Sequence, residues 1–342
     1  MKVAVVGTGI HGASTAKEFA RRGHQVTVFE QFQPGHERGS SHGESRIVRK
    51  AYPDPYYTSL MAEAYPLWAD LERDTGQKLL HEVGLAYFGP ETSPRLRSMA
   101  AGLDEVHEPY ELLDAASVRR VSPQLRLSEG EVAVFTPAAG WVDASKCTSL
   151  SLGLAQSYGA EIRPAQHIER EALEHEFDAF VVAPGAWIRD WLPTLPVKVT
   201  LQTVAFFDAA IEGPVWIEDS EQFAYGFPTH ESAGVKLAFH FPGRPIDASS
   251  ADREPDAEFV RSLVDVLDGR FGIAKAPLRR AYGCLYTNTP DEDFRLGRLG
   301  PSGFYVSACS GHGFKFGPWI GKLMADFVEG VKTPEAFPRF NA

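Results

Sequence analysis

Near its start the chain reads VAVVGTGIHG over residues 3–12, and this stretch decides the fold. The apolar run of residues 3–6 predicts a strand buried on both faces, because polar residues do not alternate within it. Small and apolar residues then recur at helical spacing over residues 13–20, and a basic pair and a glycine at residues 21–23 end that pattern. Residues 25–29 read as a second strand, so the first 30 residues predict a right-handed βαβ unit in a parallel sheet.

Three glycines of this turn, Gly7, Gly9 and Gly12, form the pattern GxGxxG. Between a strand and a helix they permit a tight turn and bring the helix N-terminus close to a pyrophosphate. Glu30 ends the second strand 18 residues after Gly12, where a carboxylate would accept hydrogen bonds from ribose hydroxyls. The plain alternative is a glycine-rich turn with a solvated glutamate, and the flanking strand and helix argue against it. The pattern therefore predicts a dinucleotide ligand, FAD or NAD.

The composition narrows the class of protein. A length of 342 residues suggests about two domains, and 44% hydrophobic residues suffice for a sizeable core. Because 45 Asp and Glu outnumber 34 Lys and Arg, the formal charge is -11, which disfavours nucleic acid and anionic membranes as partners. No stretch of about 18 apolar residues predicts a membrane span. The three cysteines form neither an even set nor a CxxC pair, so we expect a protein of the reducing cytoplasm.

Further along the chain the pattern alternates between two kinds of structure. Residues 178–183 form another buried-strand run, which ends in Pro184-Gly185-Ala186-Trp187 and belongs with the first sheet. Short alternating segments from about residue 81 and over 198–241 indicate two β-rich insertions. We therefore predict a discontinuous nucleotide domain over 1–80, 142–194 and 286–342, and a substrate domain over 81–141 and 195–285.

Two arginines follow the ribose-binding strand, within GSSHGESRIVRK at residues 39–50. On a helix or turn, Arg46 and Arg49 would share a face and present guanidinium groups suited to a carboxylate. A solvated basic patch is the ordinary interpretation. Their position close to the expected cofactor favours a site.

Four segments resemble a known family. They read GSSHGESRIVR (39–49), YGFPTHESAGVKLAFHF (225–241), GCLYTNTPDEDF (283–294) and CSGHGFKFGP (309–318). In this order they are similar to the monomeric sarcosine oxidase and N-methyltryptophan oxidase group of FAD-dependent amine oxidases, within the D-amino acid oxidase superfamily. The resemblance extends from Gly7 to the last expected helix.

The resemblance implies FAD joined through a thioether to Cys284. Taken alone, Cys284 would be a small buried hydrophobic residue, as Cys147 and Cys309 are expected to be. The loop at residues 311–315 follows a strand and precedes a helix, so its amides can face the flavin. The residues expected at the cofactor are Gly7, Gly9, Ile10, His11, Gly12, Glu30, Ser40, His42, Ser45, Arg46, Gly185, Trp187, Cys284, Gly311, His312, Gly313, Phe314 and Lys315.

The resemblance also implies catalytic and substrate-binding residues. Lys236 would stand over the flavin and supply positive charge where oxygen is reduced, although by itself it would read as a snorkelling surface lysine. Arg46 would add positive potential near the flavin ring. Arg49 and Lys315 would hold the substrate carboxylate, and Tyr225 and His240 would complete the pocket.

One position departs from the family. Trp216 falls at or near a pocket-lining position where the resembling oxidases carry a smaller, flexible residue. The chain is also about a tenth shorter than the family implies. We therefore expect a reshaped substrate pocket.

Together these observations predict an α/β protein, with a doubly wound FAD domain and a second α+β domain on a mixed or antiparallel sheet. The expected reaction is oxidative demethylation of sarcosine or another N-methyl amino acid, giving a primary amino acid, formaldehyde and hydrogen peroxide. We expect a cytoplasmic monomer whose partners are a small amino acid and oxygen, without a metal. The alternatives are an oxidase of cyclic imino acids or D-amino acids, a dehydrogenase with another acceptor, a flavin-carrying subunit without turnover, and an NAD dehydrogenase.

Overall fold

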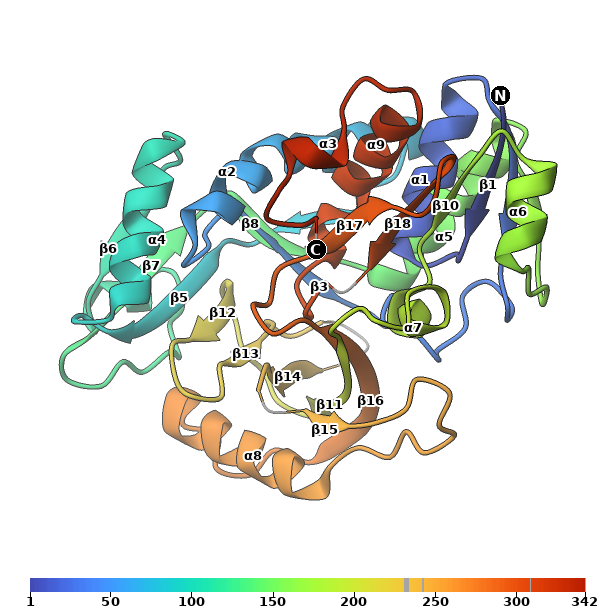
Figure 1. Cartoon of the computed structure of the whole chain (residues 1–342). Helices are drawn as coiled ribbons and strands as arrows, with labels where there is room; N and C mark the ends of the chain where they lie inside the picture. The colour runs from blue at the N-terminus through green and yellow to red at the C-terminus, as the bar shows by residue number, and fades with distance from the viewer. Residues whose placement is uncertain (231–233, 242, 308, 342) are drawn as a thin grey trace.

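The computed structural model describes residues 1–230, 234–241, 243–307 and 309–341. Residues 231–233 of the segment 225–241 lie outside these ranges, and so does Ala308. Within them the chain forms three sheets with helices on their faces (Figure 1).

The first sheet has six strands in the order β17-β18-β10-β1-β2-β9 among the described residues. Their bounds are β1 Lys2–Val6, β2 Gln25–Phe29, β9 Glu161–Arg163, β10 Ala179–Val182, β17 Arg295–Arg298 and β18 Gly303–Ser307. β1 pairs in parallel with both β2 and β10, so the predicted βαβ unit and the later buried strand lie side by side. Only β17 runs antiparallel in this sheet as described. The expected doubly wound sheet is confirmed.

Helices cover this sheet because their apolar residues face it. The helices concerned are α1 Ile10–Arg21, α5 Ala144–Ser157, α6 Arg170–Glu176, α7 Ile188–Trp191 and α9 Gly317–Val328. α1 packs between α5 and α9. Its residues Ala16 and Phe19 are fully buried in a core shared with β1 and β2. The strand and helix that carry the glycine pattern are thereby fixed on both sides.

The second sheet is larger and mostly antiparallel, and its path is β15-β11-β14-β13-β12-β5-β7-β6 with β16 paired to β11. Its strands are β5 Leu85–Pro90, β6 Glu111–Leu113, β7 Glu131–Thr136, β11 Lys198–Phe207, β12 Val215–Glu218, β13 Ala224–Gly226, β14 Val235–Phe239, β15 Arg244–Pro245 and β16 Leu278–Asn288. Only β5 and β12 pair in parallel within the described part of this sheet. α8 (Ala257–Phe271) covers one face at the bottom of Figure 1, and α4 (Pro94–Glu105) packs beside β5. The expected mixed sheet is confirmed.

A small third sheet joins β3 (Arg46–Arg49), β8 (Ala139–Val142) and β4 (Leu80–Glu82). Here one assumption of the sequence analysis is wrong. Arg46 and Arg49 lie on a strand and not on a helix or turn, so side chains three residues apart start out on opposite faces. α2 (Pro55–Ala64) and α3 (Pro66–Thr75) are separate helices, because Pro66 has no amide hydrogen with which to continue the hydrogen bonding of α2.

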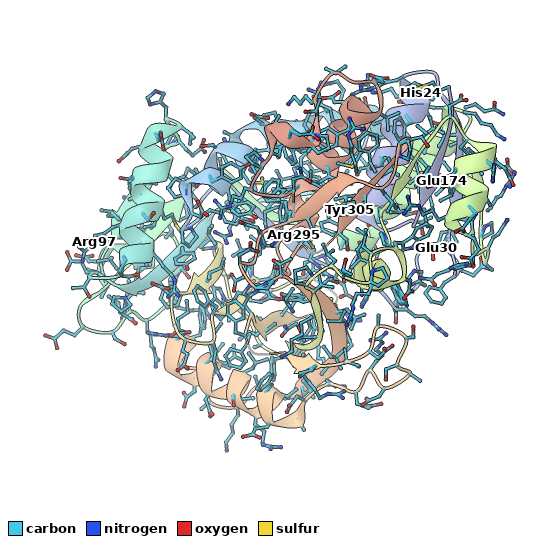
Figure 2. All side chains as sticks on the ribbon, in the orientation of Figure 1. His24, Glu30, Arg97, Glu174, Arg295 and Tyr305 are labelled. Atoms are coloured by element: carbon cyan, nitrogen blue, oxygen red, sulfur yellow. The ribbon has the colours of Figure 1, made fainter. Side chains whose placement is uncertain are left out.

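The strands of the two large sheets come from the two sets of ranges proposed for the domains, apart from the end of β16. The domain boundaries themselves stay a prediction. In Figure 2, Glu30, which directly follows β2, lies on the right of the molecule, and Arg97 of α4 lies on the left. Among the described residues, no helix is both long enough and apolar enough to cross a membrane.

Candidate active site

A cavity of about 580 Å³ lies between the two large sheets, within the range of small-molecule sites. The loops after β1, β2 and β18 line one side of it, and β13, β14 and β16 line the other. Most of the predicted site residues line this cavity. They are Gly7, Gly9, Ile10, His11, Glu30, Ser40, His42, Ser45, Arg46, Arg49, Gly185, Trp187, Tyr225, Lys236, His240, Cys284, Gly311, His312, Gly313, Phe314 and Lys315.

The glycine pattern forms a turn that excludes side chains. A Cβ atom on Gly12 would lie 2.0 Å from the Gly7 carbonyl oxygen, and one on Gly7 would lie 2.5 Å from that of Ala183. Gly7 also has a φ of +98°, which favours glycine. The N-cap residue of α1 is Gly9, which has no side chain to cap the helix, and the first turn holds no acid, so that among the first amides only that of Ile10 has a side-chain acceptor in the described part of the chain, the Ser41 hydroxyl at 3.1 Å. The helix end is therefore open to an anion such as a pyrophosphate.

Glu30 is 3% exposed and lies at the end of β2. One of its carboxylate oxygens accepts from the Thr8 amide at 2.9 Å and the Thr8 hydroxyl at 2.7 Å, and the other accepts from the Phe32 amide at 2.9 Å. Although burial opposes ionisation, these bonds and His36 lower the pKa of Glu30. A fixed carboxylate with unused lone pairs fits the expected ribose contact.

The part of the cavity that Trp187 lines is aromatic. Trp187 lies in a short 3-10 helix, packs edge-on to Phe32 at 5.4 Å between ring centroids, and donates to the Ser249 hydroxyl. The Gly185 carbonyl, also in that helix, accepts from Ser307 at 2.6 Å. These contacts fix the loop after β10 beside the end of the glycine turn.

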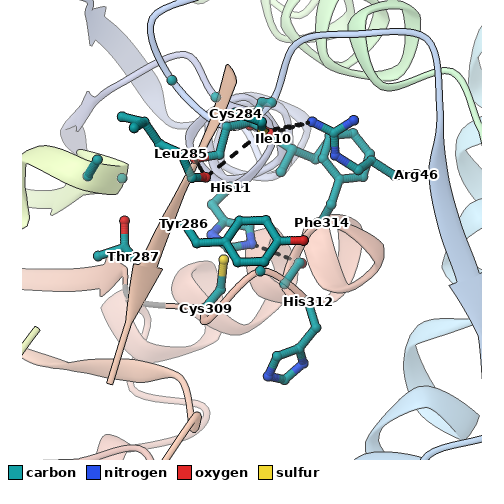
Figure 3. A pocket seen from close by; sticks show the side chains of 18 of the residues that line it. Ile10, His11, Arg46, Cys284, Leu285, Tyr286, Thr287, Cys309, His312 and Phe314 are labelled. Atoms are coloured by element: carbon teal, nitrogen blue, oxygen red, sulfur yellow. Dashed lines mark hydrogen bonds between the residues drawn. The ribbon is translucent and has the colours of Figure 1, made fainter. Parts of the chain in front are cut away.

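Arg46 and Cys284 meet in the middle of the cavity wall (Figure 3). The guanidinium group donates to the backbone carbonyls of Ser40, His42 and Ser45 at 2.8–2.9 Å and lies 3.6 Å from the Cys284 sulfur. Cys284 is 4% exposed on β16 and lines the cavity. The Ser40 hydroxyl donates to the Leu285 carbonyl, so this loop is tied to β16.

His42 is 8% exposed, and its Nε2 atom has no hydrogen-bond partner among the described residues. Burial lowers its pKa to about 4, and Arg46 and Lys236 act in the same direction. A neutral imidazole with a free nitrogen on the cavity wall is what a ligand with its own donor or acceptor would satisfy. The ring of His42 is also held by a contact with Tyr282.

Lys236 is 3% exposed on β14 and is not a surface lysine. Its ammonium group donates to the Ser45 carbonyl at 2.7 Å and lies 3.2 Å from the Ser45 hydroxyl. Burial and the nearby Arg46 lower the pKa of Lys236 well below its usual value. Ser45, expected only as a cofactor contact, therefore also positions this lysine.

Arg49 and Lys315 lie around Tyr52 at the other end of the cavity. The Arg49 guanidinium stacks over the Tyr52 ring at 4.2 Å and donates to the Ala51 carbonyl. Lys315, 6% exposed, donates to the Tyr52 hydroxyl at 3.0 Å and to the His312 carbonyl at 2.7 Å. Burial and Arg49 lower the pKa of Lys315 well below its usual value. Tyr52 was missed from the sequence, although it follows Arg49 by only three residues.

The four cations of the cavity share one property. Arg46, Arg49, Lys236 and Lys315 all donate to backbone carbonyls, and none forms an ion pair within the described residues. Buried cations without counter-charges are costly to the folded protein and are stabilised by an anionic ligand. The cavity is thus prepared for anions, although the chain is acidic.

Tyr225 and His240 both contact Tyr286, a residue that the sequence analysis did not predict at the site. Tyr286 hydrogen-bonds to Tyr225, and its ring lies 5.3 Å from that of His240. Tyr286 was recognisable, because it follows Cys284 by two residues on β16 and so projects from the same face. Burial, Lys315 and Arg49 lower the pKa of His240 to about 4, which keeps the imidazole neutral.

The loop at residues 311–315 is tied to the glycine pattern. His11, at the start of α1, bonds through Nε2 to the Gly313 carbonyl at 3.1 Å, as Figure 3 shows. Phe314 stacks on Trp68 at 6.3 Å and lies under Arg46. The loop is therefore held beside the start of α1 and lines the cavity.

The prediction for Trp216 is wrong. Trp216 is 1% exposed and packs against Phe88 and Phe271, between the second sheet and α8, and not in the cavity. Side chains alternate along a strand, so the next residue of β12, Ile217, lines the cavity instead. The sequence therefore predicted the pocket-lining position of β12 to within one residue, and a shift of one residue moves a side chain to the opposite face of the strand.

The described residues fit FAD. The glycine turn fits a pyrophosphate, Glu30 fits a ribose, and the free His42 nitrogen and Cys284 lie where a flavin would complete the wall. No group of three or more His, Cys, Asp or Glu residues suited to a metal occurs in the described part of the chain.

Comparisons with known proteins agree with this geometry. The sequence model of a family described as FAD dependent oxidoreductase matches residues 2–327. A monomeric sarcosine oxidase of Streptomyces avermitilis is 33% identical, over 95% of this chain and 93% of its own. An N-methyl-L-tryptophan oxidase of Yersinia pestis is 28% identical, over 96% and 95%. Among solved structures, NikD, an amino acid oxidase of nikkomycin biosynthesis, superposes with a TM-score of 0.82 at 25% identity, over 97% and 94%.

Proposed function

We propose that this chain, which belongs to the family of FAD-dependent oxidoreductases, oxidises the N-methyl group of a secondary amino acid with oxygen as acceptor. At the coarser level the chain is an FAD-dependent oxidase of amines or amino acids related to the sarcosine oxidases. The observation that carries the proposal is the unpaired Arg49 and Lys315 at one end of the cavity. Two fixed cations suit a carboxylate.

The reaction has a simple balance. An N-methyl amino acid, oxygen and water give the primary amino acid, formaldehyde and hydrogen peroxide. Bound FAD would accept two electrons and a proton from the amine and deliver electrons to oxygen. The C–N bond is oxidised to an imine, and water then cleaves the imine to the amine and the aldehyde.

The protein residues have separate tasks in this proposal. Arg49 and Lys315 bind the carboxylate, and Tyr225, Tyr286 and the neutral His240 shape the pocket around the amine. The surrounding positive charge disfavours a substrate ammonium, so the amine loses its proton more readily. Lys236 and Arg46 supply positive potential where oxygen is reduced, which is the effect expected to gain most in a dry site.

Further parts of the proposal rest on smaller observations. Cys284, buried on the cavity wall, forms a thioether to FAD. The protein works as a monomer in the cytoplasm without nucleic acid, in keeping with its charge of -11 and three free cysteines.

A substrate panel tests the function. Sarcosine and larger N-methyl amino acids should give formaldehyde and hydrogen peroxide in equal amounts, both measured in coupled assays. Arg49→Met should raise KM for these substrates about 10- to 100-fold, because a charged hydrogen bond to the carboxylate is lost. Arg97→Met, on the exposed surface of α4, is the matched control and should leave KM unchanged.

The same panel separates the alternatives. Hydrogen peroxide without formaldehyde from L-proline, L-pipecolate or D-amino acids would favour an oxidase of those substrates and would refute the demethylation. A chain that binds FAD and turns over no amine would be a flavin-carrying subunit.

A further inference from the structure

The cavity extends beyond Arg49 and Lys315 to a rim that the proposed reaction does not use. Arg95, Phe223 and Glu292 line this rim, and the buried Tyr87 lines the cavity near Arg49. They come from β5, the start of α4, the loop before β13 and the loop between β16 and β17. A site at this rim rests on the proposed function, in which the substrate carboxylate binds Arg49 and Lys315.

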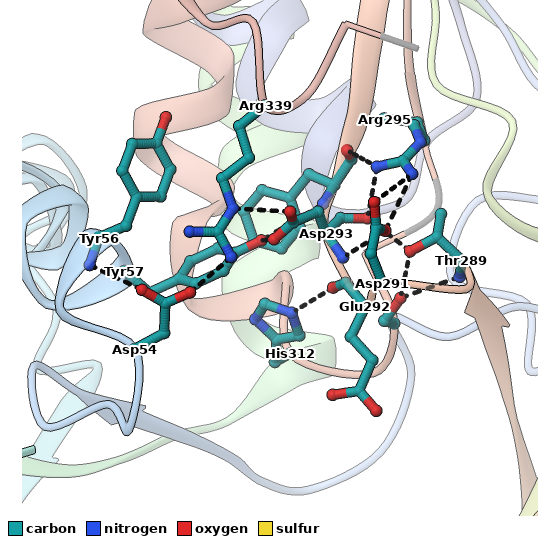
Figure 4. Close-up of polar contacts among 12 residues, drawn as sticks. Asp54, Tyr56, Tyr57, Thr289, Asp291, Glu292, Asp293, Arg295, His312 and Arg339 are labelled. Atoms are coloured by element: carbon teal, nitrogen blue, oxygen red, sulfur yellow. Dashed lines mark hydrogen bonds and ion pairs between the residues drawn. The ribbon is translucent and has the colours of Figure 1, made fainter. Parts of the chain in front are cut away.

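Glu292 is exposed at the rim, yet its backbone is fixed. Its φ is +63°, its amide donates to the Thr289 carbonyl at 3.3 Å, and its carbonyl contacts His312 Nε2 at 3.0 Å. Its carboxylate forms no hydrogen bond or ion pair with another described residue, and Figure 4 shows it extending away from the neighbouring polar cluster. Partial burial raises the pKa of Glu292, with Arg95 acting in the opposite direction.

The neighbouring charges are already paired. Asp291 binds Arg295 at 2.8 Å, and Arg339 binds both Asp54 and Asp293 at 2.5–2.6 Å (Figure 4). These bonds leave no cation of the cluster for Glu292.

Arg95, the cation at the rim, already has a charged partner. It lies 3.3 Å from Asp219, whose side chain is only 4% exposed and therefore needs a counter-charge. Its guanidinium group also stacks over Phe223 at 4.8 Å. The charge that remains available at the rim is the negative charge of Glu292.

The imidazole ring of His312 lies between the backbone of Glu292 and Lys315, one of the two cations proposed to bind the substrate carboxylate. Lys315 donates to the Tyr52 hydroxyl at 3.0 Å, and that hydroxyl lies 3.3 Å from His312 Nδ1. Burial lowers the pKa of His312 well below its usual value, so the ring is neutral. Since the Glu292 carbonyl can only accept, Nε2 carries the proton and Nδ1 accepts from Tyr52. A chain of hydrogen bonds through the neutral His312 ring therefore joins Lys315 to the backbone of Glu292.

Tyr87 provides an independent sign of a ligand. It is 1% exposed, and its hydroxyl has no hydrogen-bond partner among the described residues. Its ring lies 5.9 Å from Arg49, and it lines the same cavity. A buried hydroxyl without a partner costs free energy unless a bound molecule satisfies it.

We propose that Tyr87 and Glu292 form a side-chain subsite for a substrate with a second cationic group, that is, a basic secondary amino acid. The carboxylate binds Arg49 and Lys315, and the distal cation of the side chain donates a hydrogen bond to the Tyr87 hydroxyl and pairs with Glu292. Glu292 thus determines specificity and takes no part in the oxidation itself.

Three unreactive carboxylates of equal chain length test this subsite: hexanoate, 6-aminohexanoate and adipate. Their dissociation constants for the FAD-loaded protein are measured by calorimetry. 6-Aminohexanoate should bind about three- to fivefold more tightly than hexanoate, as expected for an exposed ion pair. The preference should shrink in 0.5 M salt, because salt screens such a pair. Adipate should bind no better than hexanoate.

Variants assign the preference to its residues. Glu292→Gln keeps the shape of the side chain and should abolish the preference, while Glu129→Gln, which removes an exposed charge from another loop, should retain it. Tyr87→Phe should weaken 6-aminohexanoate more than hexanoate. Equal binding of the two in the unmodified protein, tighter binding of adipate, or a preference that survives Glu292→Gln would overturn the subsite alone. Failure of all three carboxylates to bind would overturn the proposed carboxylate contact and the subsite together.

Discussion

At the scale of single residues, unpaired buried cations set the chemistry of the cavity. Lys236 and Lys315 are almost fully buried, and the carbonyls that accept their hydrogen bonds carry no formal charge. Each cation therefore attracts whatever negative charge enters or develops beside it. The attraction is strong because little water remains to screen it.

Replacing Lys236 tests its role in the reaction with oxygen. Lys236→Met keeps much of the side-chain volume and removes the charge, so reoxidation of the reduced protein by oxygen should slow about 100-fold or more. Reduction by substrate should change little, because Arg49 and Lys315 are intact. Stopped-flow measurement of the two half-reactions separates these effects. An equal loss in both would show that Lys236 acts by maintaining the pocket's shape, and unchanged reoxidation would remove it from the oxygen reaction.

The sequence predicted some of these residues and not others, for physical reasons. Glycine patterns are local, so Gly7, Gly12 and Glu30 could be recognised from spacing alone. Contacts between distant segments, such as Lys236 with Ser45, depend on how the sheets pack and have no local signal. Trp216 shows the limit most clearly, since an error of one residue exchanges the core for the cavity.

At the scale of elements, β16 joins the two halves of the site. It pairs with β11 along most of its length, and it presents Cys284 and Tyr286 to the cavity. The sequence indicated only short strands over 198–241, but β11 runs from Lys198 to Phe207. A long strand with few turn residues is hard to bound from its pattern alone, because apolar and polar residues do not alternate cleanly along it.

The position of Cys284 on this strand allows a direct test of covalent attachment. Cys284→Ser should preserve β16, since serine is similar in size and its strand partners are backbone groups. The variant should bind FAD that acid precipitation releases into the supernatant, whereas the unmodified protein should keep its yellow colour in the pellet. Release of all flavin from the unmodified protein would refute the thioether and leave the fold unaffected.

At the scale of the whole molecule, the cations that line the cavity contrast with the negative net charge of the chain. The chain carries a net charge of -11, yet its cavity is lined by four cations without ion-pair partners among the described residues, and its rim holds an unpaired carboxylate. A small zwitterion or a basic amino acid is matched by that arrangement, whereas a polyanion meets an acidic surface. The parallel sheet could be predicted from the βαβ unit and the second sheet from the short alternating segments, whereas the class of enzyme came from the resemblance of four segments to a known family.

The polarity of the cavity could not be predicted in the same way. It results from which charged groups are already paired, as Arg95 is with Asp219, and pairing appears only once the chain is folded. The substrate is accordingly the property that the sequence predicts least directly.

The central claim is that this protein oxidises a secondary amino acid through bound FAD and returns the electrons to oxygen. The most direct measurement is the visible spectrum of the purified protein, titrated without oxygen with sarcosine, then with larger and basic N-methyl amino acids and L-proline, and finally opened to air. We expect a yellow protein that loses its colour when an N-methyl amino acid is added and regains the colour in air. A colourless protein, or a yellow one that no secondary amino acid bleaches, would contradict it.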